Sequence, residues 1–498
     1  MPLDSVLLSR IQFALTVGFH YLFPPLTIGL GLLMVFMEGA YLRTKNREYE
    51  AMAKFWTKIF GLIFAMGVAT GIVMEFQFGT NWSAYSRFVG DVFGAALAAE
   101  GIFAFFLESG FLAVLVFGWE RVSARMHFFA TCMVALGSIF SAIWIVVANS
   151  WQQTPAGFTT EEFAGVWRAE LTSFWGAVLN PSTVNRLTHT LIGAFIMGGF
   201  FVTSVSAYYL LKGRHEWFAR KSIAFALPFA AVFSIVQLVS GHFNSQMVGE
   251  HQPTKLAAFE GHFKTEPGGT PLHLFGWVDE QAREVRYGVA VPGLLSFLTY
   301  SDWNRPVRAL DDPNALPESV TPLERNEPIE KYWPPVNLSF QTYRLMVGLG
   351  MLFILLTVGG TLLLWHGRLF RMRWLLYVLV FAVIGPVLAN QAGWAAAEVG
   401  RQPWIVWGLM RTSQAVSPAV TGGQVLGSII MFGVIYLLLL VLWLFLMDHK
   451  IRTGPESPAE LAEGPPADWL TTAAEFHDAK RRHSLTDVRP SGENREKE

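Results

Sequence analysis

Cysteine and charge are scarce in this sequence. Its 498 residues include one cysteine, Cys132, which excludes disulfide frameworks, CxxC redox pairs and cysteine-ligated zinc or iron–sulfur sites. Any bound metal must therefore be held by histidine, methionine or carboxylate groups. Only 15% of the residues are charged and the formal net charge is −1, so no basic excess indicates a nucleic-acid partner.

Apolar residues, by contrast, are abundant. Hydrophobic residues make up 52% of the chain and aromatic residues 14%, and the mean hydropathy of +0.37 lies outside the range of soluble globular domains. Runs long enough to cross a bilayer, about 20 residues each, occur near 14–40, 55–76, 92–118, 127–150, 188–211, 219–241, 343–365, 373–397 and 425–447. We therefore expect an all-α integral membrane protein with about nine transmembrane helices.

Lysine and arginine are concentrated in alternate short loops. They fall on one side of the membrane: Arg43, Lys45, Arg47, Arg121, Arg125, Lys212, Arg214, Arg220, Lys221, Arg368, Arg371, Arg373, Lys450 and Arg452. The positive-inside rule makes that side cytoplasmic. We therefore expect the N-terminus to lie outside and the C-terminus in the cytoplasm.

The chain divides into four parts. Residues 1–241 would form the first six transmembrane helices, 242–342 a long proline-rich loop on the outer side, and 343–448 the last three helices. A loop that long is usually functional. Residues 449–498 would form a polar cytoplasmic tail, largely disordered apart from an amphipathic stretch at 468–483, to which we assign no chemistry.

A few polar residues lie inside the spans. Of twelve histidines, only His20 and His189 do so, and for a lone intramembrane histidine an interhelical hydrogen bond is about as good an explanation as a ligand role. The helix directions place both in the outer half of the membrane, together with Met346, Glu398 and Glu100. A prosthetic group near the outer surface requires such a shared depth. Imidazole, thioether and carboxylate are all axial ligands that iron porphyrins accept.

Three arginines, Arg10, Arg344 and Arg401, share this outer level. Contact with lipid headgroups explains them simply, whereas pairing with haem propionates would use their planar, bidentate donors. Met346 alone is a weak indication of a ligand, because most of the sixteen methionines are expected to fill gaps in the core.

Two pairs of ionisable residues suggest proton chemistry. Glu100 and Glu108 are eight residues apart on one helix, and a buried carboxylate usually exchanges a proton or binds a cation, so we expect a proton relay, with a helix-packing hydrogen bond as the alternative. In the outer loop, Lys255 and Glu260 flank an apolar patch at helical spacing. An amphipathic surface helix is the simpler interpretation, but the segment also offers the proton acceptor and apolar slot that a quinol needs.

Seven segments, in order along residues 5 to 447, resemble subunit I of the cytochrome bd-type quinol:dioxygen oxidases. They are SRIQFALTVGFHYLFPPLTIG, TGIVMEFQFGTNW, AAEGIFAFFLESGF, LGSIFSAIWIVVANSW, TKLAAFE, YRLMVGLG and AEVGRQPW. The string GRQPW is especially specific. The resemblance implies that the outer loop is a Q-loop of the shorter kind.

The resemblance also implies cofactor ligands. His189 and Met346 would be the axial ligands of a low-spin haem b that receives electrons from quinol. Glu398 would bind a high-spin haem b. His20 would ligate the oxygen-reducing haem, either haem d or a third haem b, with Glu100 at or near its iron.

Further roles follow from the same resemblance. Lys255 and Glu260 match the quinol-oxidation segment of the Q-loop, and Glu108 and Ser141 match a proton route that rises from the cytoplasm. The two matching arginines near the haem sites are Arg344 and Arg401.

The implied enzyme oxidises membrane quinol at the outer face. It reduces dioxygen to water with cytoplasmic protons, and so generates a proton motive force without pumping. Implied partners are subunit II and a small single-helix accessory subunit, and the implied location is the bacterial inner membrane.

Two other classes remain open at this point. A proton- or cation-coupled transporter would account for the intramembrane carboxylates, but no inverted repeat is visible and such a protein does not require Met346. A cytochrome b that passes electrons from quinol to another protein would explain His189 and Met346 and leave His20 and Glu398 without a role.

Overall fold

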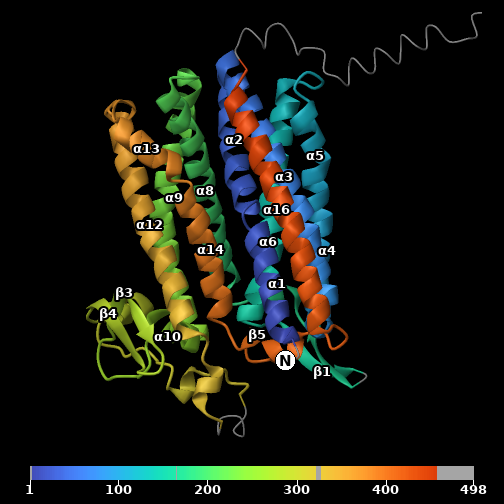
Figure 1. The fold of residues 1–498 in the computed structure, drawn as a ribbon, viewed down its shortest axis with the longest axis vertical. Helices are drawn as coiled ribbons and strands as arrows, with labels where there is room; N and C mark the ends of the chain where they lie inside the picture. The colour runs from blue at the N-terminus through green and yellow to red at the C-terminus, as the bar shows by residue number, and fades with distance from the viewer. Residues whose placement is uncertain (1–2, 164, 321–326, 457–498) are drawn as a thin grey trace, which may run out of the picture.

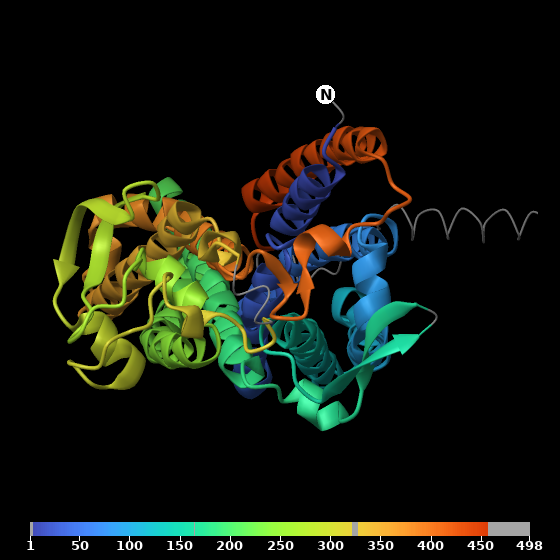
Figure 2. The same ribbon diagram turned by 90° about the horizontal axis from the view of Figure 1, so that it is seen from below.

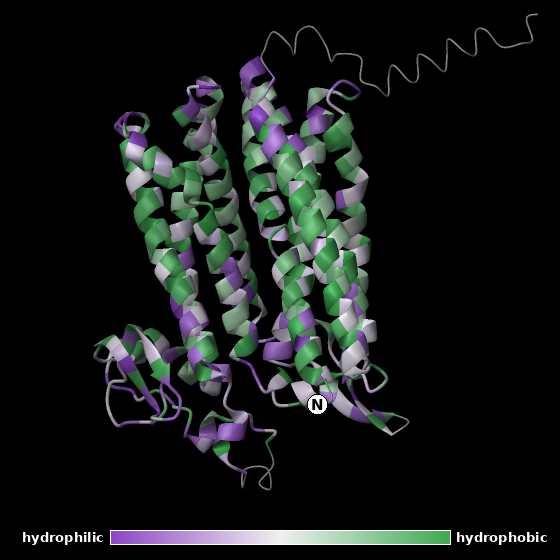
Figure 3. Cartoon of the chain, viewed as in Figure 1, coloured by the Kyte–Doolittle hydropathy of each residue, from purple (hydrophilic) through white to green (hydrophobic). Residues whose placement is uncertain are grey.

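The computed structural model describes residues 3–163, 165–320 and 327–456. Most of the expected polar tail, including 468–483, therefore lies outside the described residues. Within the described part of the chain, nine helical segments are long and apolar enough to cross a membrane. They confirm the expected all-α membrane fold, and their middle sections are the most hydrophobic parts of the molecule (Figure 3).

Six of the spans are continuous helices. In chain order these are α3 (Arg47–Thr80), α6 (Ala124–Gln153), α8 (Thr183–Lys212), α9 (Glu216–His251), α12 (Val336–Trp365) and α16 (Gly422–Thr453). Several extend beyond the apolar run from which they were predicted. The segment that separates α9 from α12 is consequently 252–335.

The other spans are interrupted. They are built from α1 (Ser5–His20) with α2 (Pro24–Thr44), from α4 (Ser83–Ala99), the π-helical turn η1 (Glu100–Phe105) and α5 (Phe106–Phe117), and from α13 (Arg373–Phe381) with α14 (Ile384–Val399).

The first interruption corrects the single helix expected over 14–40. Pro24 and Pro25 have no backbone N–H to donate, so the helix ends at His20 and restarts at Pro24. A π-helical turn such as η1 is rare and often marks a functional site. Both His20 and Glu100 therefore lie at irregular points of their spans.

The spans form two groups of helices (Figures 1 and 2). One contains α8, α9 and α12 to α14, and the other contains α1, α3 to α6 and α16. Helix α2 joins them by packing on α8, where Gly29 and Gly198 meet so closely that a Cβ atom on Gly29 would lie 2.3 Å from the backbone oxygen of Ala194. Small residues of this kind allow membrane helices to approach at the backbone.

The connections at the two ends of the bundle differ. One end, where the N-terminus lies, carries the long connections (Figure 1). These hold β1 (Phe158–Phe163), β2 (Val166–Leu171), α7 (Phe174–Val178), α10 (Pro253–Glu260), β3 (Leu272–Asp279), β4 (Glu284–Val291), α11 (Leu294–Tyr300), η2 (Pro313–Ala315), η4 (Ile329–Tyr332), β5 (Trp404–Val406), β6 (Met410–Arg411) and α15 (Thr412–Ala415). The strands pair as antiparallel hairpins, β1 with β2, β3 with β4, and β5 with β6. The opposite end carries the short basic loops, with η5 (Leu369–Arg371) in one of them.

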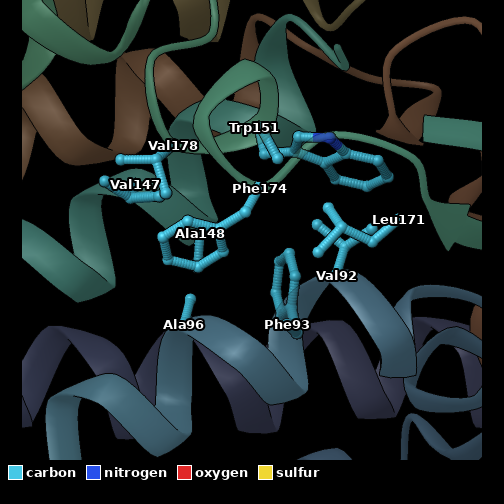
Figure 4. Close-up of a pocket in the computed structure, with 10 residues that line it drawn as sticks. Val92, Phe93, Ala96, Val147, Ala148, Trp151, Leu171, Phe174 and Val178 are labelled. Atoms are coloured by element: carbon cyan, nitrogen blue, oxygen red, sulfur yellow. The ribbon is translucent and has the colours of Figure 1, made fainter. Parts of the chain in front are cut away.

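Helix α4 is packed tightly against α6 and the segment after it. The pocket between them has a volume of only about 10 Å³ and is lined by apolar side chains, among them Phe93, Ala148 and Trp151 (Figure 4). That volume is at the lower limit for a single water molecule, and the indole N–H of Trp151 in the lining already donates to the backbone oxygen of Ala156. This packing fixes α4 relative to α6, on which Ser138 and Ser141 lie.

Candidate functional site

A cavity of about 1860 Å³ lies between the two groups of helices and is lined by residues from both. It is larger than the 300 to about 1,000 Å³ typical of a pocket for one small ligand. All of the predicted site residues line it except Glu260 and Arg344. Residues that are far apart in the sequence are thus brought to one interior space.

Helix α14 provides a common depth scale for these residues. Three contacts mark it: Gly18 with Gln391, Met346 with Gly393, and Asn149 with Glu398. From Gln391 to Glu398 the helix rises about 10 Å, at about 1.5 Å per residue. His20 follows Gly18 by two residues on α1 and therefore lies near the Gln391 end of this range.

The imidazole of His20 is held by a hydroxyl group. Its Nδ1 lies 2.9 Å from Oγ1 of Thr70, which itself donates to the backbone oxygen of Met66 at 2.7 Å. Because that hydroxyl proton is already used, His20 must donate from Nδ1, which leaves Nε2 as the atom able to bind a metal.

His189 and Met346 come from the other group of helices. Nδ1 of His189 lies 3.3 Å from Oγ of Ser240, and its Nε2 forms no hydrogen bond with a described residue. The Met346 thioether occupies space that Gly393 leaves open, since a Cβ atom at position 393 would lie 2.7 Å from its sulfur. Both side chains face the cavity.

Glu398 is the most extensively hydrogen-bonded carboxylate of the site. Its Oε2 accepts from Nη2 of Arg401, and its Oε1 accepts from Asn149 at 3.0 Å and from Gln153 at 3.4 Å. Nη1 of Arg401 donates to Oε1 of Gln152 at 2.8 Å. The side chains of Glu398 and Arg401 are 16% and 5% exposed, so Arg401 is buried and Glu398 is largely buried.

Several members of this cluster were not predicted from the sequence. Arg186 donates to Asn149 and, at 3.2 Å, to Oγ of Ser150, and it lines the cavity. The sequence did indicate Arg186, because this residue lies one helical turn before His189 at the start of an apolar span. The run NSWQQ at the end of another span, 149–153, was a second signal that went unused.

Lys255 lies on α10 and is only 2% exposed. Its Nζ donates to Oε1 of Gln153 at 2.7 Å and to Oε1 of Gln252 at 3.3 Å. Burial, reinforced by the positive charges of Arg186 and Arg401, holds the pKa of Lys255 well below its usual value. All residues of α10 are buried, so this helix is not the amphipathic surface helix that the spacing also allowed.

Glu260 ends the same helix and is 1% exposed. It forms an ion pair with Arg344, and the neighbouring rings of Phe259 and Tyr343 stack with their centroids 4.7 Å apart. Burial raises the pKa of Glu260, and the charge of Arg344 opposes that rise. Nε of Arg344 is buried without an acceptor among the described residues.

The two carboxylates of the α4–α5 span have serine partners on α6. Ser141 donates to Oε1 of Glu100 at 2.6 Å, and Ser138 donates to Oε1 of Glu108. Ser141 was predicted, whereas Ser138 was missed, although the two serines lie one turn apart. Of the predicted arginines, Arg10 stands apart: it lines the cavity, is exposed, and forms no ion pair with a described residue.

Comparison with known proteins gives a consistent result along the chain. The family model for cytochrome bd terminal oxidase subunit I matches residues 8–455. Cytochrome bd ubiquinol oxidase subunit 1 of Bacillus subtilis (strain 168) is 40% identical over 454 residues, covering 91% of this chain and 95% of the relative. Cytochrome bd-II ubiquinol oxidase subunit 1 of Escherichia coli (strain K12) is 36% identical over 506 residues, covering 91% and 98%.

A solved structure agrees with these matches. The bd oxidase from Geobacillus thermodenitrificans superimposes with a TM-score of 0.80 at 28% identity, over 91% of this chain and 100% of that chain. The transporter and electron-transferring cytochrome b interpretations are therefore set aside. The protein is a quinol oxidase of a haem-containing, multi-pass membrane family, and its partners are subunit II, quinol and oxygen. The chain belongs to the family of subunit I of the cytochrome bd terminal oxidases.

Proposed function

We propose that the chain oxidises quinol at the end where α10 lies and reduces dioxygen to water within the large cavity. Protons would enter from the opposite end, so that charge is separated across the membrane without a pump. The observation that carries the proposal is the single cavity, which gathers histidine, methionine and carboxylate groups from both helix groups. Haem groups bound there would supply electron transfer and oxygen reduction.

The residues present fit such groups. His189 and Met346 would hold a low-spin haem b, and His20 would hold the oxygen-site haem, haem d or a third haem b, with Glu100 close by. Each histidine offers Nε2, because Nδ1 is engaged by a hydroxyl. Glu398 would serve a high-spin haem b: it accepts three of about four possible hydrogen bonds, which leaves an oxygen lone pair free.

The arginines also fit anionic groups. Nε of Arg344 and Nε of Arg401 are buried without acceptors among the described residues. A haem propionate or a quinol oxygen would satisfy these donors, which otherwise cost free energy in a dry interior. Arg10, at the exposed rim of the cavity, would make a similar contact.

Quinol oxidation requires an acceptor for each hydroxyl proton. Lys255 is suited to this because its lowered pKa gives it a neutral amine at a lower pH than a free lysine has. Glu260, held by Arg344, would act as the second polar group beside the stacked rings of Phe259 and Tyr343.

Protons for water would follow the α4–α5 span. Glu108 would receive a proton from the basic end and pass it towards Glu100, with Ser138 and Ser141 as the hydroxyl partners along α6. The serines are separated by about 4.5 Å along the helix, at about 1.5 Å per residue. By the positive-inside rule the basic end would be cytoplasmic, and the N-terminus and α10 would lie on the outer side of what would be the bacterial inner membrane. We also propose that a small single-helix accessory subunit binds this chain.

The visible spectrum of the dithionite-reduced protein tests the assignment. We expect low-spin bands together with high-spin features that change with carbon monoxide. Met346→Leu should convert or abolish the low-spin signal and leave the high-spin bands. Unchanged low-spin bands in that variant would remove Met346 as a ligand.

A further inference from the structure

Gln153 is fully buried at the end of α6, and none of the roles above uses it. Its Oε1 accepts hydrogen bonds from Nζ of Lys255 at 2.7 Å and from Nε2 of Gln252 at 3.1 Å. Its Nε2 donates to the backbone oxygen of Ala397 and to Oε1 of Glu398, both at 3.4 Å. One amide group therefore contacts both the quinol-oxidation segment and the α14 carboxylate.

The surroundings of Gln153 permit only one orientation of this amide. If it were turned over, its NH₂ group would face the amine of Lys255 and the NH₂ group of Gln252, and its oxygen would face the carbonyl of Ala397 and the carboxylate of Glu398. Its oxygen would then oppose two acceptors, the Ala397 carbonyl and the Glu398 carboxylate, and its NH₂ group would oppose that of Gln252. The hydrogen-bond network thus fixes the amide, with its positive end towards the carboxylate.

Gln153 is also the only described side chain that forms hydrogen bonds to both Lys255 and Glu398. We infer that Gln153 is a positioning residue that ties the Lys255 amine to the Glu398 carboxylate, so that the quinol site and the neighbouring haem site are held in register. The inference rests on the proposed function. Because coupling between two sites is reciprocal, a substitution of Lys255 should alter the haem site at Glu398, and a substitution of Glu398 should alter quinol binding near Lys255.

Gln153→Leu removes both contacts from the complete oxidase with its subunit II. We expect the KM for quinol to rise by about tenfold or more, the loss expected for one hydrogen bond to a charged or strongly polar partner. The absorption or midpoint potential of the high-spin haem should also change, while the low-spin bands that depend on Met346 stay in place. In a Lys255→Met background, Gln153→Leu should add little further rise in the KM for quinol, because the contact between these two residues is already lost.

Gln153→Glu is the rescue variant. It keeps an acceptor for Lys255 but replaces the donor to Glu398 with a second acceptor, so its KM for quinol should lie closer to that of the wild type than the KM of Gln153→Leu does, while the high-spin haem signal should still change. The matched control is Gln341→Leu, which loses hydrogen bonds to the backbone oxygen of Gly276 at 2.8 Å and to Oδ1 of Asn337 at 3.2 Å, and which does not line the cavity. It should leave both the KM and the haem bands unchanged.

The outcomes distinguish a failure of the proposed function from a failure of the role inferred for Gln153. A wild-type oxidase that consumes no oxygen with quinol would remove the proposed function itself. A folded, haem-loaded Gln153→Leu oxidase with wild-type KM and haem bands would overturn the inference alone. Where Gln153→Leu does not assemble, Gln153→Asn carries the test, since its shorter side chain cannot span both partners and a wild-type KM in it also overturns the inference.

Discussion

The intramembrane carboxylates of this protein are held in two different ways. At the C-terminal end of α14, Glu398 accepts hydrogen bonds from three side chains, one of them a guanidinium. In the α4–α5 span, Glu100 and Glu108 each have a serine as the hydrogen-bond partner among the described residues. A guanidinium partner suits a carboxylate that keeps its charge and position, whereas a hydroxyl partner suits one that exchanges protons. This difference predicts that Glu398 serves cofactor binding, whereas Glu100 and Glu108 serve proton transfer during turnover.

The largest effect should come from breaking the ion pair at Glu398. Arg401→Leu leaves a buried carboxylate without its cation, which typically costs about 3–5 kcal/mol. We expect loss of the high-spin haem signal and a poorer yield of assembled oxidase, measured by haem content per protein. Arg401→Lys, which keeps the charge but not the planar fork, should be intermediate. Normal haem content in Arg401→Leu would contradict the binding role.

Glu108→Gln should affect turnover and leave binding intact. Loss of a proton-transfer group typically slows a reaction by about 100-fold or more, so oxygen consumption should fall while haem content stays normal. Glu216→Gln, which changes an exposed carboxylate at the same end of the molecule, is the matched control. Full oxygen consumption in Glu108→Gln would remove Glu108 from the proton route.

The pH dependence of quinol oxidation should report on Lys255. Its folded-state pKa is lowered, so the amine loses its proton at a lower pH than a free lysine does, and kcat/KM for quinol should rise as the pH increases through that lowered pKa. By the same linkage, the folded state disfavours protonated Lys255, so its contribution to stability improves as the pH rises towards the ordinary lysine pKa. Lys255→Met should abolish this limb of the pH profile. A profile that is unchanged in Lys255→Met would show that another group accepts the proton.

The smallest effect should come from the serines. Ser141→Ala removes one hydrogen bond from Glu100, worth about 1 kcal/mol, so oxygen consumption should fall by no more than about fivefold. Ser138→Ala tests Glu108 in the same way. If either serine variant is as slow as Glu108→Gln, the hydroxyl itself carries the proton, and the two serines are more than hydrogen-bond partners.

Much of the fold follows from hydropathy. All the predicted spans exist, because an apolar run of sufficient length has no stable place outside a membrane or a core. The boundaries were less predictable: α9 continues to His251 although its apolar run ends ten residues earlier, near 241. The interruption before Pro24 was readable from the proline pair, but the predicted continuous helix ignored it.

The site was only partly predictable. Motifs pointed to His20, His189, Met346 and Glu398 one by one, and the helix directions suggested their shared depth. They did not indicate Arg186 or Gln153, because a polar residue at a helix end resembles an ordinary cap until its neighbours are known. The burial of Lys255 was likewise invisible, since the spacing of α10 is equally compatible with an exposed helix.

Taken alone, the sequence determined the membrane class, the order of the spans and the residue types able to hold a metal, since these depend on local composition and on the absence of cysteine pairs. Which polar groups meet was decided by tertiary structure. The amide of Gln153 lies between Lys255 and Glu398 only because α6, α10 and α14 converge at one end of the bundle. Hydrogen bonds are short-ranged and directional, so no pattern along the chain specifies partners that lie more than a hundred residues apart.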